Sequence, residues 1–165
     1  KQEKEQDGEK KVKTIVIYSP VTGKAADLST APDAAFAGQM MGDGAAVTPE
    51  DPIVRALEDG EICFVFDTRH AIGFLTDSEI SLLIHIGIDT VKLGGKGFEA
   101  LVENGQKVKK GDPMLKLDLE YLKANAPSIV SPVLCTELQE NENIRLLNTG
   151  TIPAGEALFA VDIYE

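Results

Sequence analysis

The feature of this 165-residue sequence that most restricts its fold is the regular return of glycine-containing turns between short runs of aliphatic and β-branched residues. From Val12 onward the turn signals are Asp43-Gly44, Asp59-Gly60, Gly94-Gly95-Lys96-Gly97, Asn104-Gly105 and Lys110-Gly111-Asp112. Short apolar runs bounded by such turns are typical of antiparallel strands. The spacing therefore predicts an all-β fold, a flattened sandwich or barrel of short antiparallel strands.

Helical patterns are scarce and short. The best candidate runs from Leu119 to Ala126 and is ended by Pro127, and Phe98 to Val102 offers a second possible turn of helix. We expect one or two short helices.

An internal repeat supports the all-β prediction. Residues 108–119 (VKKGDPMLKLDL) and 152–163 (IPAGEALFAVDI) share their apolar positions, a glycine and an aspartate, and the tripeptide at 19–21 (SPV) recurs at 131–133. Each unit predicts a strand, a glycine turn and a second strand, and two such hybrid-motif-like units can cover each other's faces in a sandwich. The alternative is chance, because turn chemistry alone imposes part of the pattern.

The charge distribution divides the chain into a tail and one domain. Residues 1–12 are mostly charged and lack apolar periodicity, so we expect a disordered tail or the remnant of a linker. Residues 13–165 are long enough, in a chain that is 43% hydrophobic, to form a single domain with its own core. Because the chain begins with lysine, it could be a piece of a longer protein.

Composition also excludes some partners. A formal net charge of -11 argues against binding to nucleic acid. The sequence shows neither a stretch apolar enough to insert into a membrane nor a secretion signal, so we expect a cytoplasmic location. Cys63 and Cys135 are far apart and outside any CxxC pattern, so we interpret them as reduced core thiols.

The two histidines are the strongest functional candidates. His85 is the only polar residue in the apolar run 82–88 (LLIHIGI), and His70 follows Asp67-Thr68-Arg69 after another apolar run, 62–66 (ICFVF). An ionisable ring in an apolar strand must be satisfied by a partner. We interpret the two segments as neighbouring strands whose histidines meet, although a lone histidine is often a structural side chain bonded to a carbonyl.

Strand alternation suggests what surrounds the two rings. If residues 81–88 are extended, Leu82, Ile84, Ile86 and Ile88 share the apolar face, whereas His85 and Gly87 share the other one. Gly87 would then leave open space beside the ring. Thr68 and His70 would lie on one side of an extended chain, so a hydroxyl, two imidazoles and a glycine gap could accommodate an anion.

Several segments together carry a resemblance to a known family. They are residues 19–23 (SPVTG), 31–33 (APD), 36–37 (FA), 41–44 (MGDG), 67–71 (DTRHA), 85–91 (HIGIDTV), 96–98 (KGF), 105–108 (GQKV) and 111–112 (GD). From about Thr14 to Ile163, the sequence resembles the enzyme IIA domain of the glucose-type sugar phosphotransferase system. The two histidine segments are the most specific, because they occur in order at the family's separation.

The resemblance implies a phosphohistidine carrier, a component of a phosphotransferase, without a cofactor or metal. Such domains accept a phosphoryl group from the histidine-containing phosphocarrier protein and donate it to a cysteine of a IIB domain for sugar uptake. His85 would be phosphorylated through Nε2, with His70 as the partner imidazole. Thr68 would hydrogen-bond within the pair, and Gly87 would orient His85 through a backbone group. The domain would work in the cytoplasm, within or docked to a membrane permease.

The resemblance also implies a docking patch around the histidines, made of Asp33, Ala34, Ala35, Phe36, Met40 and Val91. From the residues alone, 33–37 (DAAFA) reads as an irregular loop, and Phe36 fits the core better than the surface. Asp89 would place negative charge near the phosphoryl group and limit how tightly it is held, unless Asp89 only caps the turn before Val91.

Two other classes stay open at this point. The histidine pair with an aspartate could hold zinc, as a binding module or in a zinc peptidase of related sandwich fold, although such peptidases use more histidines. A biotinyl or lipoyl carrier would need a modified lysine at a turn, for which Lys96 is the best candidate.

Overall fold

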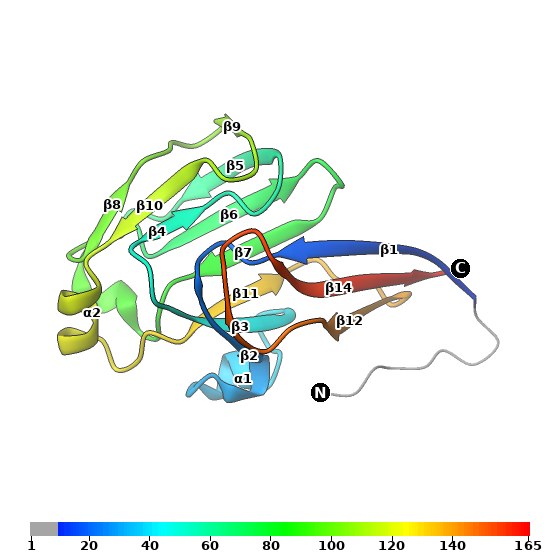
Figure 1. The fold of residues 1–165 in the computed structure, drawn as a ribbon, viewed down its shortest axis with the longest axis horizontal. Helices are drawn as coiled ribbons and strands as arrows, with labels where there is room; N and C mark the ends of the chain where they lie inside the picture. Colours follow the sequence, from blue (N-terminus) through cyan, green and yellow to red (C-terminus); the bar gives the residue numbers. More distant parts are fainter. Residues whose placement is uncertain (1–9) are drawn as a thin grey trace.

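The computed structural model describes residues 10–165, which form a β-sandwich of mainly antiparallel strands (Figure 1). The strands are β1 Lys11–Tyr18, β2 Gly23–Asp27, β3 Asp43–Pro49, β4 Ile53–Arg55, β5 Gly60–Val65, β6 Ala71–Thr76, β7 Ser81–His85, β8 Phe98–Ala100, β9 Lys107–Val108, β10 Pro113–Leu117, β11 Ser131–Cys135, β12 Glu142–Leu146, β13 Gly150–Ile152 and β14 Ala157–Tyr164. The helices are η1 Leu28–Thr30, α1 Ala34–Ala37, η2 Thr90–Leu93 and α2 Leu119–Asn125. The predicted fold class is confirmed.

The strands form one large and two small sheets. The large sheet has the order β13-β2-β3-β11-β7-β6-β5-β9, and the small sheets have the orders β1-β14-β12 and β4-β10-β8. Figure 1 shows β1, β14 and β12 side by side, with α2 at the opposite end of the molecule. All three sheets bury side chains in one aliphatic core, which includes Ile17 and Val161, Val54 and Leu115, and Ile72 and Ile84.

A second, smaller apolar cluster positions the functional site. It consists of Leu28, Ala31, Phe36, Ala71, Leu83, Ile88 and Leu134. Because side chains alternate along a strand, Leu83 joins this cluster while Leu82 and Ile84 on either side of it join the main core. The cluster therefore covers the outer face of the large sheet, where β7 ends in His85.

The internal repeat is present as a strand, a glycine turn and a second strand, but neither unit is a hairpin. β9 pairs with β5 while β10 pairs with β4 and β8, so the turn at Gly111 carries the chain from one sheet to another. Each turn makes two backbone hydrogen bonds to a single residue elsewhere in the chain. In the turn at Gly155, the Gly155 N–H donates to the Ser19 carbonyl and the Ser19 N–H donates to the Glu156 carbonyl. Ala56 makes the equivalent two bonds to Gly111 and Asp112. The equivalent bonding favours genuine internal symmetry over chance.

Some local predictions need correction. The helix from Leu119 is confirmed, but Phe98–Ala100 is strand β8, because it pairs with β10 after the left-handed turn at Gly97. The predicted loop at 33–37 contains helix α1, since Asp33 Oδ1 accepts the N–H groups of Ala35 and Phe36.

Two further outcomes concern the tail and the cysteines. Most of the predicted tail lies outside the described residues, and its last members, Lys11 and Val12, already belong to β1. Cys135 is buried as expected, but Cys63 is exposed. The register of β5 against β6 shifts between Ile62 and Phe64, so Cys63 is the extra residue of a bulge and leaves the core face.

Candidate functional site

The two histidines lie side by side because each adjoins one of two paired strands. His70 precedes β6 and His85 ends β7, and these strands pair with Ala71 opposite His85. The ring centroids are 4.8 Å apart, and the ring planes meet at 83°. The predicted meeting of the histidines is confirmed, but the predicted strand pairing is wrong. The run that contains β5 is separated from β7 by β6, to which the chain returns after a turn.

One hydrogen bond fixes the tautomer of His85. The Nδ1 atom lies 2.8 Å from the carbonyl oxygen of Gly87. A carbonyl oxygen can only accept, so Nδ1 carries the hydrogen and donates it. The neutral ring then has its lone pair on Nε2, which makes Nε2 the nucleophilic atom.

The carbonyl that orients His85 is itself held in place. The N–H of Ile88, which belongs to the same peptide group as the Gly87 carbonyl, donates to the carbonyl of Ser128 at 3.0 Å. The N–H of Gly87 donates to Oγ of the buried Ser131, also at 3.0 Å. Both peptide groups that flank Gly87 are thereby fixed. Ser131 begins the second Ser-Pro-Val motif, which was predicted to be part of a repeat but not of the site.

Gly87 does not provide the open space that the sequence predicted. Its φ is +77°, which ends the extended conformation before residue 88 and moves Ile88 into the outer cluster. A Cβ at this position would lie 2.6 Å from Cγ2 of Thr90 and 2.9 Å from the carbonyl oxygen of Ser128. The position requires glycine for its backbone conformation and close packing.

Thr68 contacts His70 as predicted, but for a different structural reason. Thr68 Oγ1 and His70 Nδ1 are 2.6 Å apart. The segment between them is not extended, because Arg69 has a φ of +57° within a turn closed by the bond from Arg69 N–H to the carbonyl of Phe66. The turn, rather than strand alternation, brings the hydroxyl to the ring.

Aromatic side chains border the imidazole pair on both sides. The centroid of Phe36 is 4.9 Å from that of His85, and the centroid of Phe66 is 5.2 Å from that of His70. Phe64 lies 5.2 Å beyond Phe66. Phe64 and Phe66 were not among the predicted site residues, although the alternating aromatics just before Asp67-Thr68 were a signal for them.

Both imidazoles are held in the neutral form at pH 7. Burial lowers the pKa of His70 to about 4, with a further contribution from the neighbouring His85. Burial also lowers the pKa of His85, while the bond to Gly87 and the negative charges of Asp33 and Asp89 act in the opposite direction. Neutral imidazole is the form that can attack an electrophile.

Asp89 lies at the entrance of η2 without capping it. Its φ is +55°, and its side chain makes no capping hydrogen bond to the helix. Its carboxylate pairs instead with Lys92 at 3.8 Å, and both side chains are well exposed. The capping alternative is therefore not supported, and the electrostatic role of Asp89 stays a prediction.

The predicted docking patch is only partly a surface. Met40 and Val91 are 78% and 52% exposed, and Ala34 is exposed as well. Phe36 is buried at 7% exposure, as its residue type suggested, and its ring packs against that of His85. Asp33 is half-buried and caps α1. Phe64, 43% exposed, adds an apolar side chain that the prediction did not include.

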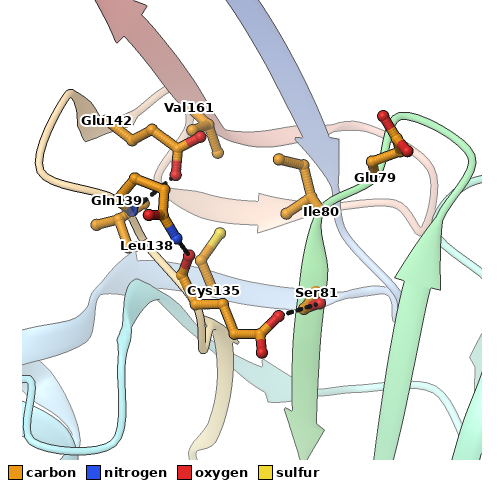
Figure 2. A pocket seen from close by; sticks show the side chains of 9 residues that line it. Glu79, Ile80, Ser81, Cys135, Leu138, Gln139, Glu142 and Val161 are labelled. Atoms are coloured by element: carbon orange, nitrogen blue, oxygen red, sulfur yellow. Dashed lines mark hydrogen bonds between the residues drawn. The ribbon is translucent and has the colours of Figure 1, made fainter.

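A cavity of about 170 Å³ lies at the other end of β7 (Figure 2). Its lining residues are Glu79, Ile80, Ser81, Cys135, Glu137, Leu138, Gln139, Glu142 and Val161. Ser81 begins β7 and donates to Glu137, whereas His85 ends the strand roughly 13 Å away. The imidazole pair does not line this cavity.

A metal site and a membrane span each place specific requirements on the described part of the chain. Among residues 10–165, no three histidine, cysteine, aspartate or glutamate side chains come together as a metal site. The zinc alternative is therefore not supported. Within the same range, no helix combines the length and the apolar character needed to cross a bilayer.

Comparison with known families matches most of the chain. Residues 15–141 match the family described as "phosphoenolpyruvate-dependent sugar phosphotransferase system, EIIA 1". The matched range includes both histidines and every predicted site residue.

Individual relatives agree with the family match. The chain is 42% identical over 144 residues to a glucose-specific EIIA component of Staphylococcus epidermidis, with 87% of each protein covered. It is 45% identical over 147 residues to a glucoside-specific EIICBA component of Staphylococcus carnosus, covering 89% of this chain but 21% of that longer protein. The solved structure of glucose permease IIA from Mycoplasma capricolum superposes with a TM-score of 0.83 at 32% identity, covering 90% of this chain and 96% of that one.

Proposed function

This chain belongs to the EIIA 1 family of the phosphoenolpyruvate-dependent sugar phosphotransferase system, and from that premise we propose that His85 carries the phosphoryl group on Nε2. The family gives the chain its general role, a phosphocarrier in sugar uptake. The proposal adds the atom that performs it. The observation that carries it is the hydrogen bond from His85 Nδ1 to the Gly87 carbonyl, which leaves the lone pair on Nε2 beside His70.

Acceptance is a displacement at phosphorus. The lone pair of His85 Nε2 attacks the phosphorus of a phosphohistidine on the donor protein, and a new P–N bond forms as the donor's P–N bond breaks. The donor nitrogen keeps the bonding electron pair. The hydrogen stays on Nδ1 and remains donated to the Gly87 carbonyl throughout, so the step requires no external base.

His70 supplies the neighbouring group for the transferred oxygens. If the Thr68 hydroxyl donates to His70 Nδ1, the hydrogen of the neutral His70 ring lies on Nε2 and can be donated to a phosphoryl oxygen. Because the turn at Arg69 and the β6–β7 ladder already hold the two rings together, this donor needs little rearrangement.

In onward transfer, His85 becomes the leaving group. A cysteine thiolate of a IIB domain attacks the phosphorus, an S–P bond forms, and the P–N bond to His85 breaks with its electron pair returning to Nε2. Phosphohistidine suits this relay because its phosphoryl group has a high transfer potential.

The partners follow from this chemistry and from the relatives. We propose the histidine-containing phosphocarrier protein as donor and a IIB domain as acceptor, on the cytoplasmic side of a membrane permease. A relative named as an EIICBA component carries a comparable region within a longer chain. Glucose-specific and glucoside-specific relatives resemble this chain to a similar degree, as expected if other domains select the sugar.

The decisive experiment is phosphorylation from phosphoenolpyruvate with the two general phosphotransferase proteins. The native chain should take up one phosphoryl group by intact mass, and His85→Gln should take up none. His70→Gln should accept the group but fail to pass it to a IIB domain. Phosphorylation of the His85→Gln variant would overturn the assignment.

A further inference from the structure

We propose that Arg69 is a positioning residue for phosphoryl transfer: its guanidinium ties the turn that carries Thr68 and His70 to the loop that follows the His85 segment, and so sets how the two imidazoles face each other. The inference rests on the proposed function of the histidine pair. It concerns the residue that lies between Thr68 and His70 in the chain and that was not among the predicted site residues.

The guanidinium of Arg69 makes two hydrogen bonds to one loop. Nε donates to the carbonyl of Phe98 and Nη2 donates to the carbonyl of Gly95, each at 3.2 Å. A Cβ on Gly95 would lie 2.6 Å from Nη2, so the guanidinium is packed directly onto the loop backbone. A forked side chain with two carbonyl partners fixes direction as well as distance.

The loop is a firm anchor because it is pinned elsewhere. Phe98 is buried in the main core and begins β8, which pairs with β10. The carbonyl of Gly97 accepts the N–H of Asp118, the residue that caps α2. The turn that carries His70 is thus connected through Arg69 to the core and to α2.

The same loop is continuous with the segment of the other histidine. From His85 the chain passes through Gly87 and η2, and it reaches Gly95 only two residues after η2 ends. The bonds of Arg69 therefore close a ring that runs from His70 through the guanidinium, the loop and η2 to His85, and back through the contact between the imidazoles. The position of the loop is thereby coupled through Arg69 to the turn that carries His70.

Arg69 also holds an uncommon backbone conformation next to His70. Its φ of +57° lies in the left-handed region, which is unfavourable for a residue with a Cβ. Asparagine and glycine adopt this conformation more easily than arginine does. Arginine at this position is therefore favoured by what its side chain contacts and not by its backbone preference.

The test separates the side-chain tether from the backbone turn. Arg69→Asn keeps a residue suited to positive φ and removes both bonds, whereas Arg69→Lys can restore only one of them. The matched control is Arg55→Gln, which removes another arginine-to-carbonyl bond, from Nη1 to Gly111, in a different sheet. Single-turnover acceptance, onward transfer to a IIB domain and the lifetime of the phosphorylated form are measured for each variant, together with urea unfolding.

We expect Arg69→Asn to slow onward transfer about tenfold while acceptance changes by less than about threefold, with Arg69→Lys between Arg69→Asn and native. Arg55→Gln should match native. The lifetime of the phosphorylated form should shift toward that of His70→Gln. In a His70→Gln background, Arg69→Asn should produce no further shift, because its effect acts through that ring.

Three results would overturn the role of Arg69. They are native rates in Arg69→Asn, an additional lifetime change in the His70→Gln background, and an equal loss in Arg55→Gln. If Arg69→Asn does not fold, Arg69→Lys decides by the same criteria. Failure of the proposed function is distinguishable, because it would appear as phosphorylation of His85→Gln whatever residue occupies position 69.

Discussion

His85 stands opposite Ala71 in the β6–β7 ladder. This register places the ring of His85 against the ring of His70, the residue before Ala71. The backbone reinforces the arrangement, since the N–H of Ile86 donates to the carbonyl of His70 at 2.8 Å. A shift by one residue would turn His85 toward the core, because side chains alternate between the faces of a sheet. The geometry of the imidazole pair is thus a consequence of strand register.

Gly87→Ala should disable the site by moving the carbonyl that orients His85. The added Cβ meets Thr90 Cγ2 at 2.6 Å and the Ser128 carbonyl at 2.9 Å, on a backbone with φ of +77°. We expect a loss of about 2–4 kcal/mol in the free energy of unfolding and little phosphoryl acceptance. Urea unfolding and single-turnover labelling measure the two effects.

The matched control for this change is Gly105→Ala. Gly105 has a similar φ of +82°, but a Cβ there meets nothing within 4 Å. It should lose about 1–2 kcal/mol, the backbone cost alone, and accept phosphate at the native rate. Equal behaviour of the two variants would show that packing at Gly87 is irrelevant to His85.

Stability should fall as the pH is lowered below about 6.5, through the buried His70. The pKa of this ring is about 4 in the folded chain and 6.5 for an unperturbed histidine, so the unfolded state binds the proton first as the pH falls. The contribution of neutral His70 to the free energy of unfolding is about 3 kcal/mol. It is fully present above pH 6.5 and is lost as the pH falls from 6.5 to 4. His70→Gln should flatten this part of the profile, as measured by urea unfolding at pH 7.5, 6 and 5. An unchanged slope would contradict the neutral, buried state of His70.

Thr68→Val should weaken His70 without affecting the nucleophile. The change removes the hydroxyl that lies 2.6 Å from His70 Nδ1 and leaves a buried ring nitrogen without that partner, at a cost of about 1–3 kcal/mol. We expect acceptance to persist and onward transfer to slow. ¹⁵N NMR of the His70 ring should report a change of tautomer. Thr68→Ser keeps the hydroxyl and should restore the native spectrum, and a Ser variant as impaired as Val would point to packing instead.

Much of this architecture follows from local sequence rules. Glycine turns predicted the all-β class, and the histidines in and after two apolar runs predicted that the rings meet. The details that failed depend on long-range pairing. Nothing in the run before Asp67 shows that β6 separates β5 from β7, and the bulge that exposes Cys63 is set by the facing strand.

The functional details that escaped prediction have the same origin. Strand alternation assigned Gly87 an open space, whereas Thr90 and Ser128 close that space after the chain turns. Ser131 and Arg69 act through backbone groups that are distant in sequence, so a pattern of neighbouring residues could not reveal them. The residue types alone identified the two histidines as the reactive groups. Tertiary contacts determine how the two rings are oriented.

Asp89→Asn tests the electrostatic role of the acidic group near His85. Asparagine tolerates the left-handed φ of +55° at this position, so the change removes charge and leaves the turn intact. The negative charge of Asp89 repels the phosphoryl oxygens, and its loss removes this repulsion. The phosphoryl group should be held more tightly and passed on about twofold more slowly. Unchanged onward transfer and an unchanged lifetime of the phosphorylated form would remove Asp89 from the mechanism.

The exposed and buried members of the predicted docking patch should respond to substitution in different ways. Val91 and Met40 are largely exposed, so Val91→Ser and Met40→Ser should change the free energy of unfolding by no more than about 0.5 kcal/mol. If Val91 and Met40 contact the phosphate donor protein, the serine variants should raise KM for that donor and leave kcat near native, since the apolar contact contributes to docking alone.

Phe36 is buried against His85, so Phe36→Ala should lower the free energy of unfolding by about 3–5 kcal/mol. It should also lower kcat, because the ring of His85 is no longer held in place. A Phe36→Ala variant with native kcat would leave Phe36 a purely structural role, and native KM in both serine variants would place the docking surface elsewhere.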